Sequence, residues 1–212
     1  MNLIVAIAGG IWGTVALTGL FLAARGLRIS RIDHGCLLGE LVLAPGPRAH
    51  VLGMIIHLLN GILFGLVYMG VMVLLGLPAV TRTTPGLQLM ATLLGGLLGL
   101  YHFFIQLPLV GLVAALHRRI RRGRGRGLAT DAEPWAFFFG ISEHATALLA
   151  HVAYGAVFGL TVASGVGAPT LVAGLATYAA LVVLSLFDLG EVTGEPRTVA
   201  FLREAEQEKV ER

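Results

Sequence analysis

Histidines recur in this chain at matching positions of two apolar segments. The pattern H-x6-H-x3-G-x2-F-G-L occurs twice, beginning once at His50 and once at His144. Imidazoles are costly inside a bilayer, and where they occur they bind metals, carry protons or hydrogen-bond across helices. Two histidine pairs at matching positions therefore predict a site that is built by symmetry.

The second histidine of each copy, together with one from another segment, forms the candidate metal site. A seven-residue step moves a side chain about 10 Å along a helix, so one ion cannot bind both histidines of a copy. We expect His57, His102 and His151 to converge at one depth, in the inner half of the membrane. Three imidazoles with an open position suit zinc, copper or iron. A haem b held by two histidines, hydrogen bonding between helices and proton passage are the alternatives.

Three other polar residues are interpreted as secondary or mouth residues of the same site. His50 and His144 precede the candidate ligands by seven residues and lie nearer the ends of their segments. Glu143 stands beside His144 and is a candidate fourth ligand, hydrogen-bond partner of a ligand or proton carrier. The one cysteine, Cys36, excludes an internal disulfide and is interpreted as a small apolar residue near a helix end.

The elements that must position these residues are membrane helices. Of the 212 residues, 56% are hydrophobic and 13% are charged, whereas soluble domains carry about 25% charged residues. A spanning helix needs about 20 mostly apolar residues. Five segments qualify, at about 3–24, 50–77, 87–116, 141–163 and 170–189. We predict an all-α integral membrane protein, with one five-helix bundle over 1–190 and a charged tail over 191–212.

The distribution of basic residues predicts the orientation. Fourteen of the fifteen lysines and arginines fall in the first loop, the third loop and the tail, and Arg82 is the exception. Basic loops stay cytoplasmic, so we expect the N-terminus outside and the C-terminus inside. The arginine-rich segment 118–127 is expected to be a cytoplasmic loop that touches anionic lipid. No aromatic residues interleave with its arginines, so nucleic acid is not an expected partner.

Each copy of the histidine pattern also carries a pair of glycines on the face of the second histidine. Glycines four residues apart let two helix backbones approach closely. The second and fourth spans run in the same direction, so we interpret the pattern as a parallel repeat about an axis along the membrane normal. The glycines predicted to pack between helices are Gly61, Gly65, Gly155 and Gly159.

Three segments carry motifs that are similar to those of one family. The motif residues are His57, Phe64 and Tyr68; His102 ahead of Pro108-Leu109-Val110-Gly111; and Pro134-Trp135, Ser142-Glu143 and His151 ahead of Tyr154. At these positions, over roughly residues 51–160, the chain resembles the YagU-like family of small bacterial inner-membrane proteins. His151 stands about one helical turn further from Ser142 than the family spacing, which leaves His144 and His151 as rival counterparts. The resemblance implies a bacterial inner-membrane location, an unassigned biochemical activity and a loose link to acid tolerance.

These observations predict a membrane-embedded histidine site that binds a transition metal, with a redox role as one option. A small-ion or proton transporter is the first alternative, because of the repeat and the polar groups near the inner face. A structural accessory subunit of a larger membrane complex is the second. The expected partners are the lipid bilayer and either further copies of this chain, in a homo-oligomer, or a larger membrane complex. The chain has no serine–histidine–aspartate order, phosphate loop or paired-carboxylate motif, so a non-enzymatic role is favoured and a metal-dependent enzyme stays open.

Overall fold

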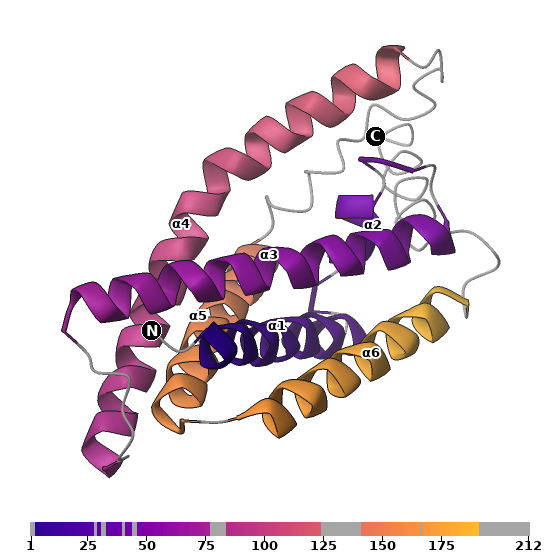
Figure 1. Cartoon of the computed structure of the whole chain (residues 1–212). Coiled ribbons are helices and arrows are strands. Elements are labelled where there is room, and N and C mark those ends of the chain that lie inside the picture. The colour runs from indigo at the N-terminus through magenta and orange to yellow at the C-terminus, as the bar shows by residue number, and fades with distance from the viewer. Residues whose placement is uncertain are drawn as a thin grey trace.

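Helices make up every regular element in the part of the chain that the structure describes. The computed structural model describes residues 3–27, 29–30, 33–39, 41–43, 46–76, 84–123, 141–165 and 167–190. The helices in chain order are α1 (Leu3–Gly26), α2 (His34–Gly39), α3 (Pro47–Leu74), α4 (Pro85–Gly123), α5 (Ile141–Ala163) and α6 (Ala168–Gly190) (Figure 1). The charged tail predicted over 191–212 and the Pro134-Trp135 motif lie outside these residues.

Five of these helices are long and apolar enough to cross a membrane, which confirms the all-helical, five-span prediction. The candidate spans are Leu3–Gly26, Pro47–Leu74, Pro85–Gln106, His144–Ala163 and Ala168–Phe187. Large apolar side chains such as Leu59, Leu97 and Phe187 are exposed on their outer faces. Such a surface is expected where lipid, rather than water, surrounds the helices.

Glycine and proline set several helix ends. Gly46 has a φ of 144°, which L side chains rarely adopt, and Pro47 follows it as the first residue of α3. Gly76 and Gly165, with φ of 72° and 60°, follow the C-terminal ends of α3 and α5. The end of α4 differs from the prediction, because the helix continues to Gly123 and includes residues expected in the arginine-rich loop. Leucine, alanine and arginine favour helix, and nothing interrupts them there before the glycine.

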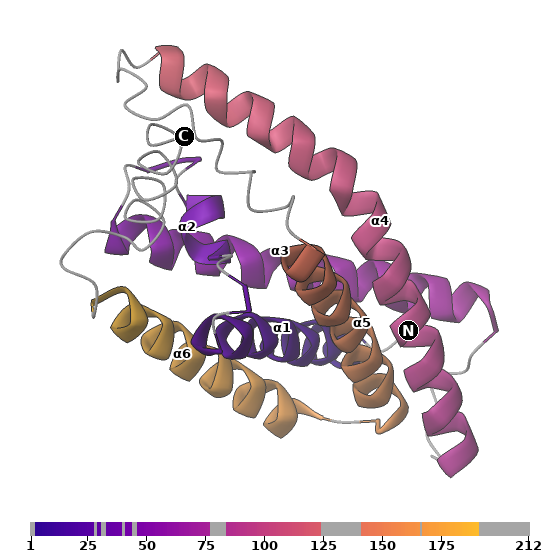
Figure 2. The same ribbon diagram turned by 180° about the vertical axis from the view of Figure 1, so that it is seen from behind.

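Helix α1 is the central element of the bundle. It packs against α3, α5 and α6, while α4 packs on α5 and the short α2 packs on α3. Figures 1 and 2 show α1 between α3 and α6, with α5 crossing it. Small residues allow these crossings: a methyl group added at Gly10 would lie 2.8 Å from the Gly61 carbonyl oxygen, and one at Gly65 would lie 2.8 Å from the Gly10 Cα.

The contact between α4 and α5 is also a backbone contact. A methyl group at Gly155 would collide with the carbonyl of Gly95, one at Gly159 with that of Ala91, and one at Gly99 with that of His151. Because the two backbones touch, side chains in the next turns of α4 and α5 are held close to each other. This crossing positions the two histidines of these helices.

Three buried tyrosines tie neighbouring helices together through backbone carbonyls. The Tyr68 hydroxyl donates to Leu98 O of α4 at 2.9 Å, and the Tyr178 hydroxyl donates to Met54 O of α3 at 2.7 Å. Tyr154 of α5 donates to Gly61 O of α3. A buried phenol needs a partner, so these bonds fix the rotation of α3 relative to three other helices.

Candidate metal centre

A carboxylate, a thiol and an imidazole converge at one end of the bundle. Asp33, Cys36 and His50 each offer one ligand atom, and all three atoms lie within 4.8 Å of one another. The His50 Nδ1 atom is 3.1 Å from Asp33 Oδ1 and 3.8 Å from Cys36 Sγ. All three residues are buried. In the described part of the chain, this is the group whose spacing fits a metal ion.

Local structure explains how Asp33 and Cys36 come together. Asp33 precedes α2, and its Oδ1 accepts a hydrogen bond from the Cys36 backbone N–H at 2.9 Å. Aspartate at a helix N-terminus commonly caps the helix in this way, because the first N–H groups have no partner within the helix. The cap therefore holds the carboxylate of Asp33 beside the residue that carries the thiol.

Glycines bring α2 against α3, which supplies the imidazole. A methyl group at Gly35 would lie 2.5 Å from His50 Nδ1, and one at Gly53 would collide with the Gly35 carbonyl. A methyl group at Gly39 would likewise collide with the carbonyl of Ala49. Only residues without a side chain allow this approach, so the sequence of α2 places Cys36 beside the first turn of α3.

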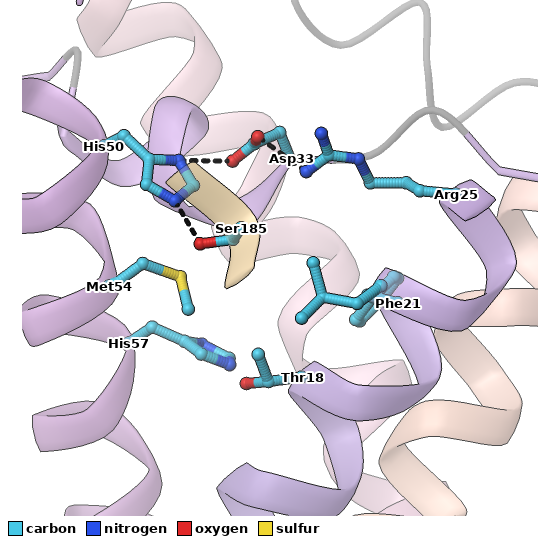
Figure 3. A pocket seen from close by; sticks show the side chains of 9 residues that line it. Thr18, Phe21, Arg25, Asp33, His50, Met54, His57 and Ser185 are labelled. Atoms are coloured by element: carbon cyan, nitrogen blue, oxygen red, sulfur yellow. Dashed lines mark hydrogen bonds and ion pairs between the residues drawn. The ribbon is translucent and has the colours of Figure 1, made fainter. Parts of the chain in front are cut away.

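Two further residues hold the candidate ligands in place (Figure 3). Arg25, in the last turn of α1, donates to Asp33 Oδ2 at 2.7 Å. Ser185 of α6 lies with its Oγ 2.7 Å from His50 Nε2, and the same Oγ donates to Val182 O at 2.7 Å. Because that hydroxyl proton is committed to Val182, we assign the proton between His50 and Ser185 to Nε2. The Nδ1 atom then faces Asp33 and Cys36.

The charges at this end of the bundle favour an ionised carboxylate. Burial raises the pKa of the Asp33 carboxyl, but the hydrogen bond with His50 and the charges of Arg25 and His50 outweigh burial. Together with the Cys36 backbone N–H, they hold that pKa well below its ordinary value. Asp33 is therefore available as an anionic oxygen ligand at any physiological pH.

A cavity lies beside Asp33 and His50 in the interior of the bundle. Asp33, His50 and Ser185 lie at one end of it, and Met54 and His57 line its α3 wall (Figure 3). The volume open to the centre of a water molecule is about 20 Å³, and roughly 10–15 Å³ is enough for one water. The cavity therefore has room for one water molecule or one ion.

The three histidines predicted as metal ligands share one region of the bundle. His57, His102 and His151 are all buried. The rings of His102 and His151 lie edge to face with centroids 5.0 Å apart, and His57 is close enough to act electrostatically on both. Their ligand atoms are not among those that meet the 4.8 Å spacing. Metal binding by these three residues stays a prediction.

Neighbouring groups already bond to several ring nitrogens of His57, His102 and His151, which we call the histidine layer. His102 Nδ1 is 3.1 Å from the Tyr68 hydroxyl, and its ring stacks on Phe64 at 3.5 Å between centroids. His151 Nδ1 donates to Ala147 O at 2.7 Å, and its Nε2 is 2.6 Å from Gln106 Oε1. Among the described residues, His102 Nε2 has no hydrogen-bond partner.

The predicted mouth residues take different positions. His50 is 1% exposed and belongs to the candidate metal centre rather than being turned toward solvent. His144 is half-buried, and the side chain of Glu143 lies outside the described residues. The imidazole of His50 contacts Asp33, Cys36 and Ser185 within the protein, which removes the reason for it to extend toward the surface.

Sequence reasoning missed Asp33 and interpreted Cys36 as an apolar side chain. The available signal was the spacing D-x2-C directly ahead of a glycine-containing helical turn, because a capping aspartate and the third residue of its helix are necessarily neighbours. The partner on α6 gave no such signal, since Ser185 is 135 residues from His50.

Comparisons with protein families, with characterised proteins and with solved structures find no match to this chain. The resemblance to the YagU-like family therefore stays a prediction. A functional proposal has to come from the chemistry of the residues described above.

Proposed function

We propose that this chain is an integral membrane protein that binds a transition metal ion at Asp33, Cys36 and His50. The observation that carries the proposal is the convergence of three ligand atoms within 4.8 Å in a buried site. Thiolate, imidazole and carboxylate together suit zinc, copper or another late transition metal, and disfavour magnesium and calcium, which prefer oxygen alone.

The residues around the ligands support this proposal. Ligands that bind metals tightly are held by outer hydrogen bonds that fix their orientation. Arg25 holds the second oxygen of Asp33, and Ser185 holds the far nitrogen of His50. Both ligand side chains are thus fixed with one donor atom turned toward the third ligand, Cys36.

The tautomer of His50 gives a further reason to expect a cation. With a proton on Nε2, the lone pair of Nδ1 and the oxygen of Asp33 face each other at 3.1 Å. Two lone pairs at this distance repel unless a proton or a metal ion lies between them. An ion that binds here also displaces the proton of the Cys36 thiol, so its binding becomes tighter as pH rises.

Cobalt(II) tests the proposal on the purified full chain in detergent or nanodiscs. After treatment with a chelator, titration should bind one equivalent and give a thiolate-to-cobalt charge-transfer absorption. Cys36→Ser should abolish this absorption and His50→Gln should weaken binding, while His144→Gln, a matched histidine outside the centre, should leave both unchanged. Absence of stoichiometric binding in the wild-type chain would overturn the proposal.

The three-histidine layer is our proposal for a second ligand position in the same bundle. It is supported by the burial of His57, His102 and His151 and by the 5.0 Å separation of two of their rings. The unpartnered Nε2 of His102 is a nitrogen that a ligand would satisfy. Binding there requires a rotation of at least one imidazole, because His151 is already bonded at both nitrogens.

We infer the membrane orientation and location from the charges. The basic residues of the first and third loops favour a cytoplasmic location for the C-terminal end of α1 and the N-terminal end of α3. Arg25, His50 and Ser185 meet at this end, so the proposed centre faces the cytoplasm. The bacterial inner membrane, the bilayer as partner and the parallel repeat of α3 and α5 belong to the same proposal.

A further inference from the structure

The connection between α1 and α3 turns polar side chains inward and apolar side chains outward. Among its described side chains, those of Ser30, Asp33 and Cys36 are buried. The exposed ones are all large and apolar, and we call them the apolar edge: Leu27 at 71% exposure, Ile29 at 50%, Val42 at 52% and Leu43 at 38%. A connection that faces water shows the reverse distribution, so this one is built for an apolar surrounding.

The apolar edge continues the lipid-facing side of α1 past the end of that helix. Leu20, Ala23 and Leu27 stand at positions i, i+3 and i+7, which is one face of a helix, and all three are exposed. The Leu27 N–H donates to Ala23 O at 2.9 Å, so the helical turn is carried on to Leu27. The outer surface of the connection therefore begins where the membrane-facing surface of α1 ends.

The backbone of the apolar edge can leave water without losing hydrogen bonds. A segment in lipid has to satisfy its N–H groups within the protein. The Ile29 N–H donates to Ala24 O at 2.8 Å. The N–H groups of Val42 and Leu43 both donate to Gly39 O, at 3.0 Å and 2.9 Å. With the bond of Leu27, every N–H of the apolar edge has a partner within the protein.

The charge at this end of the bundle favours lipid over a second copy of the chain. Arg48 is exposed in the first turn of α3, directly after the connection. Acidic phospholipids of the cytoplasmic leaflet attract such a side chain, and its long stem lets the guanidinium reach the headgroup phosphate. A second copy would bring a further basic loop against this one, and juxtaposed like charges repel.

We propose that the apolar edge lies in the cytoplasmic leaflet of the bilayer, where the acyl chains meet the headgroups, with Arg48 at the phosphate of an acidic phospholipid. The inference uses the membrane orientation proposed above and does not depend on metal binding. Lipid then covers the connection from outside, while Asp33 and Cys36 face the interior of the protein. The candidate metal centre is thereby closed to bulk water on this side.

Spin labels measure the surroundings of the apolar edge. Cys36 is the one cysteine, so labels are introduced as Leu27→Cys and as Val42→Cys in a full chain that carries Cys36→Ser. The protein is reconstituted in vesicles of phosphatidylcholine and phosphatidylglycerol. The measured quantity is the ratio of collision rates with oxygen, which concentrates in lipid, and with a water-soluble nickel chelate. Leu59→Cys, at a position 61% exposed on α3, gives the lipid reference, and free label in buffer gives the water reference.

Both labels should give a ratio between the two references, closer to water than Leu59→Cys because the apolar edge lies at the leaflet surface. A ratio equal to that of free label means that water surrounds these residues and overturns the inference. Rare collisions with both reagents mean that protein covers the apolar edge, a second copy included, and overturn it as well. Should a labelled variant not fold, Ile29→Cys and Leu43→Cys replace Leu27→Cys and Val42→Cys.

The acidic phospholipid is tested by leaving out phosphatidylglycerol. The ratio at Val42→Cys should fall in vesicles of phosphatidylcholine alone, because Arg48 then loses its anionic partner. Addition of Arg48→Gln should reduce this difference between the two vesicle types. If the ratio is the same in both vesicle types, the acidic phospholipid is wrong as the partner of Arg48. Cobalt binding by the wild-type chain is a separate measurement, so failure of the metal site and failure of this inference are distinguishable.

Discussion

The His50 Nε2 atom lies 2.7 Å from Ser185 Oγ, and this bond joins α3 to α6 across 135 residues of sequence. Ser185 donates its own proton to Val182 O, so it can only accept from His50. The serine thereby keeps a proton on Nε2, and Nδ1 is the nitrogen that is turned toward Asp33 and Cys36. Ser185 thus orients a candidate ligand without being a ligand itself.

Ser185→Ala should weaken metal binding without removing a ligand. The substitution deletes the acceptor that fixes His50, and loss of such an outer partner typically costs about 10–100-fold in affinity. Ser164→Ala is the matched control, because Ser164 makes a similar bond to the backbone four residues earlier on an exposed turn. Cobalt titration compares the variants. Equal affinity of Ser185→Ala and wild type would refute the role assigned to this bond.

Asp33→Asn should destabilise the fold, because it removes the negative partner of the buried Arg25 guanidinium. Asparagine caps a helix as well as aspartate does, so the cap of α2 survives, but the buried Arg25 loses the carboxylate oxygen that it contacts at 2.7 Å. Removing one partner of a buried ion pair costs about 3–5 kcal/mol. Reversible unfolding in mixed micelles measures the loss of unfolding free energy. The double variant Arg25→Gln/Asp33→Asn should recover part of that loss. A double variant that is less stable than Asp33→Asn would contradict this explanation.

The Asp33 carboxyl also predicts an acid dependence of the metal-free protein. Its pKa in the folded state lies well below the ordinary value of 3.8, so the folded state binds fewer protons than the unfolded state. The stabilisation is fully present above about pH 4 and is lost as pH falls below that value toward the folded pKa. The difference in unfolding free energy between wild type and Asp33→Asn should therefore shrink below pH 4. If this difference in unfolding free energy grows on acidification, the prediction is wrong.

Gly155→Ala should separate α4 from α5. The added methyl group would collide with the carbonyl of Gly95, and overpacking of this kind costs about 1–3 kcal/mol. Gly19→Ala on α1 is the control, since nothing lies within 4 Å of a methyl group there, and helical propensity favours alanine by about 1 kcal/mol. Thermal unfolding in detergent ranks the two variants. A Gly155→Ala protein as stable as Gly19→Ala would show that the close contact is unimportant.

Sequence reasoning predicted the helices because hydropathy over about 20 residues is a local signal. The start of α5 at Ile141 and its end at Ala163 coincide with the predicted fourth span. Counting residues from the membrane faces also placed His102 and His151 at one depth, and their rings are in contact. Depth along a helix follows from a fixed rise per residue, so it can be read without a structure.

The rotation of each helix about its axis and the packing of α2 could not be predicted from hydropathy or from counting residues. His50 was expected near a mouth because it stands at the start of a span, but α2 covers it and gives it Asp33 and Cys36 as neighbours. That cover depends on Gly35, Gly39 and Gly53 allowing two backbones to touch. Such contacts form at glycines of different helices, and no periodic pattern in the sequence predicts them.

X-ray absorption of the zinc-loaded full chain tests the central claim most directly, because it identifies the atoms that surround the ion. Binding at Asp33, Cys36 and His50 predicts one sulfur at about 2.3 Å and nitrogen or oxygen at about 2.0–2.2 Å. Cys36→Ser should remove the sulfur shell and keep the lighter atoms. A wild-type spectrum with nitrogen and oxygen alone, or a protein that retains no zinc, would contradict the account.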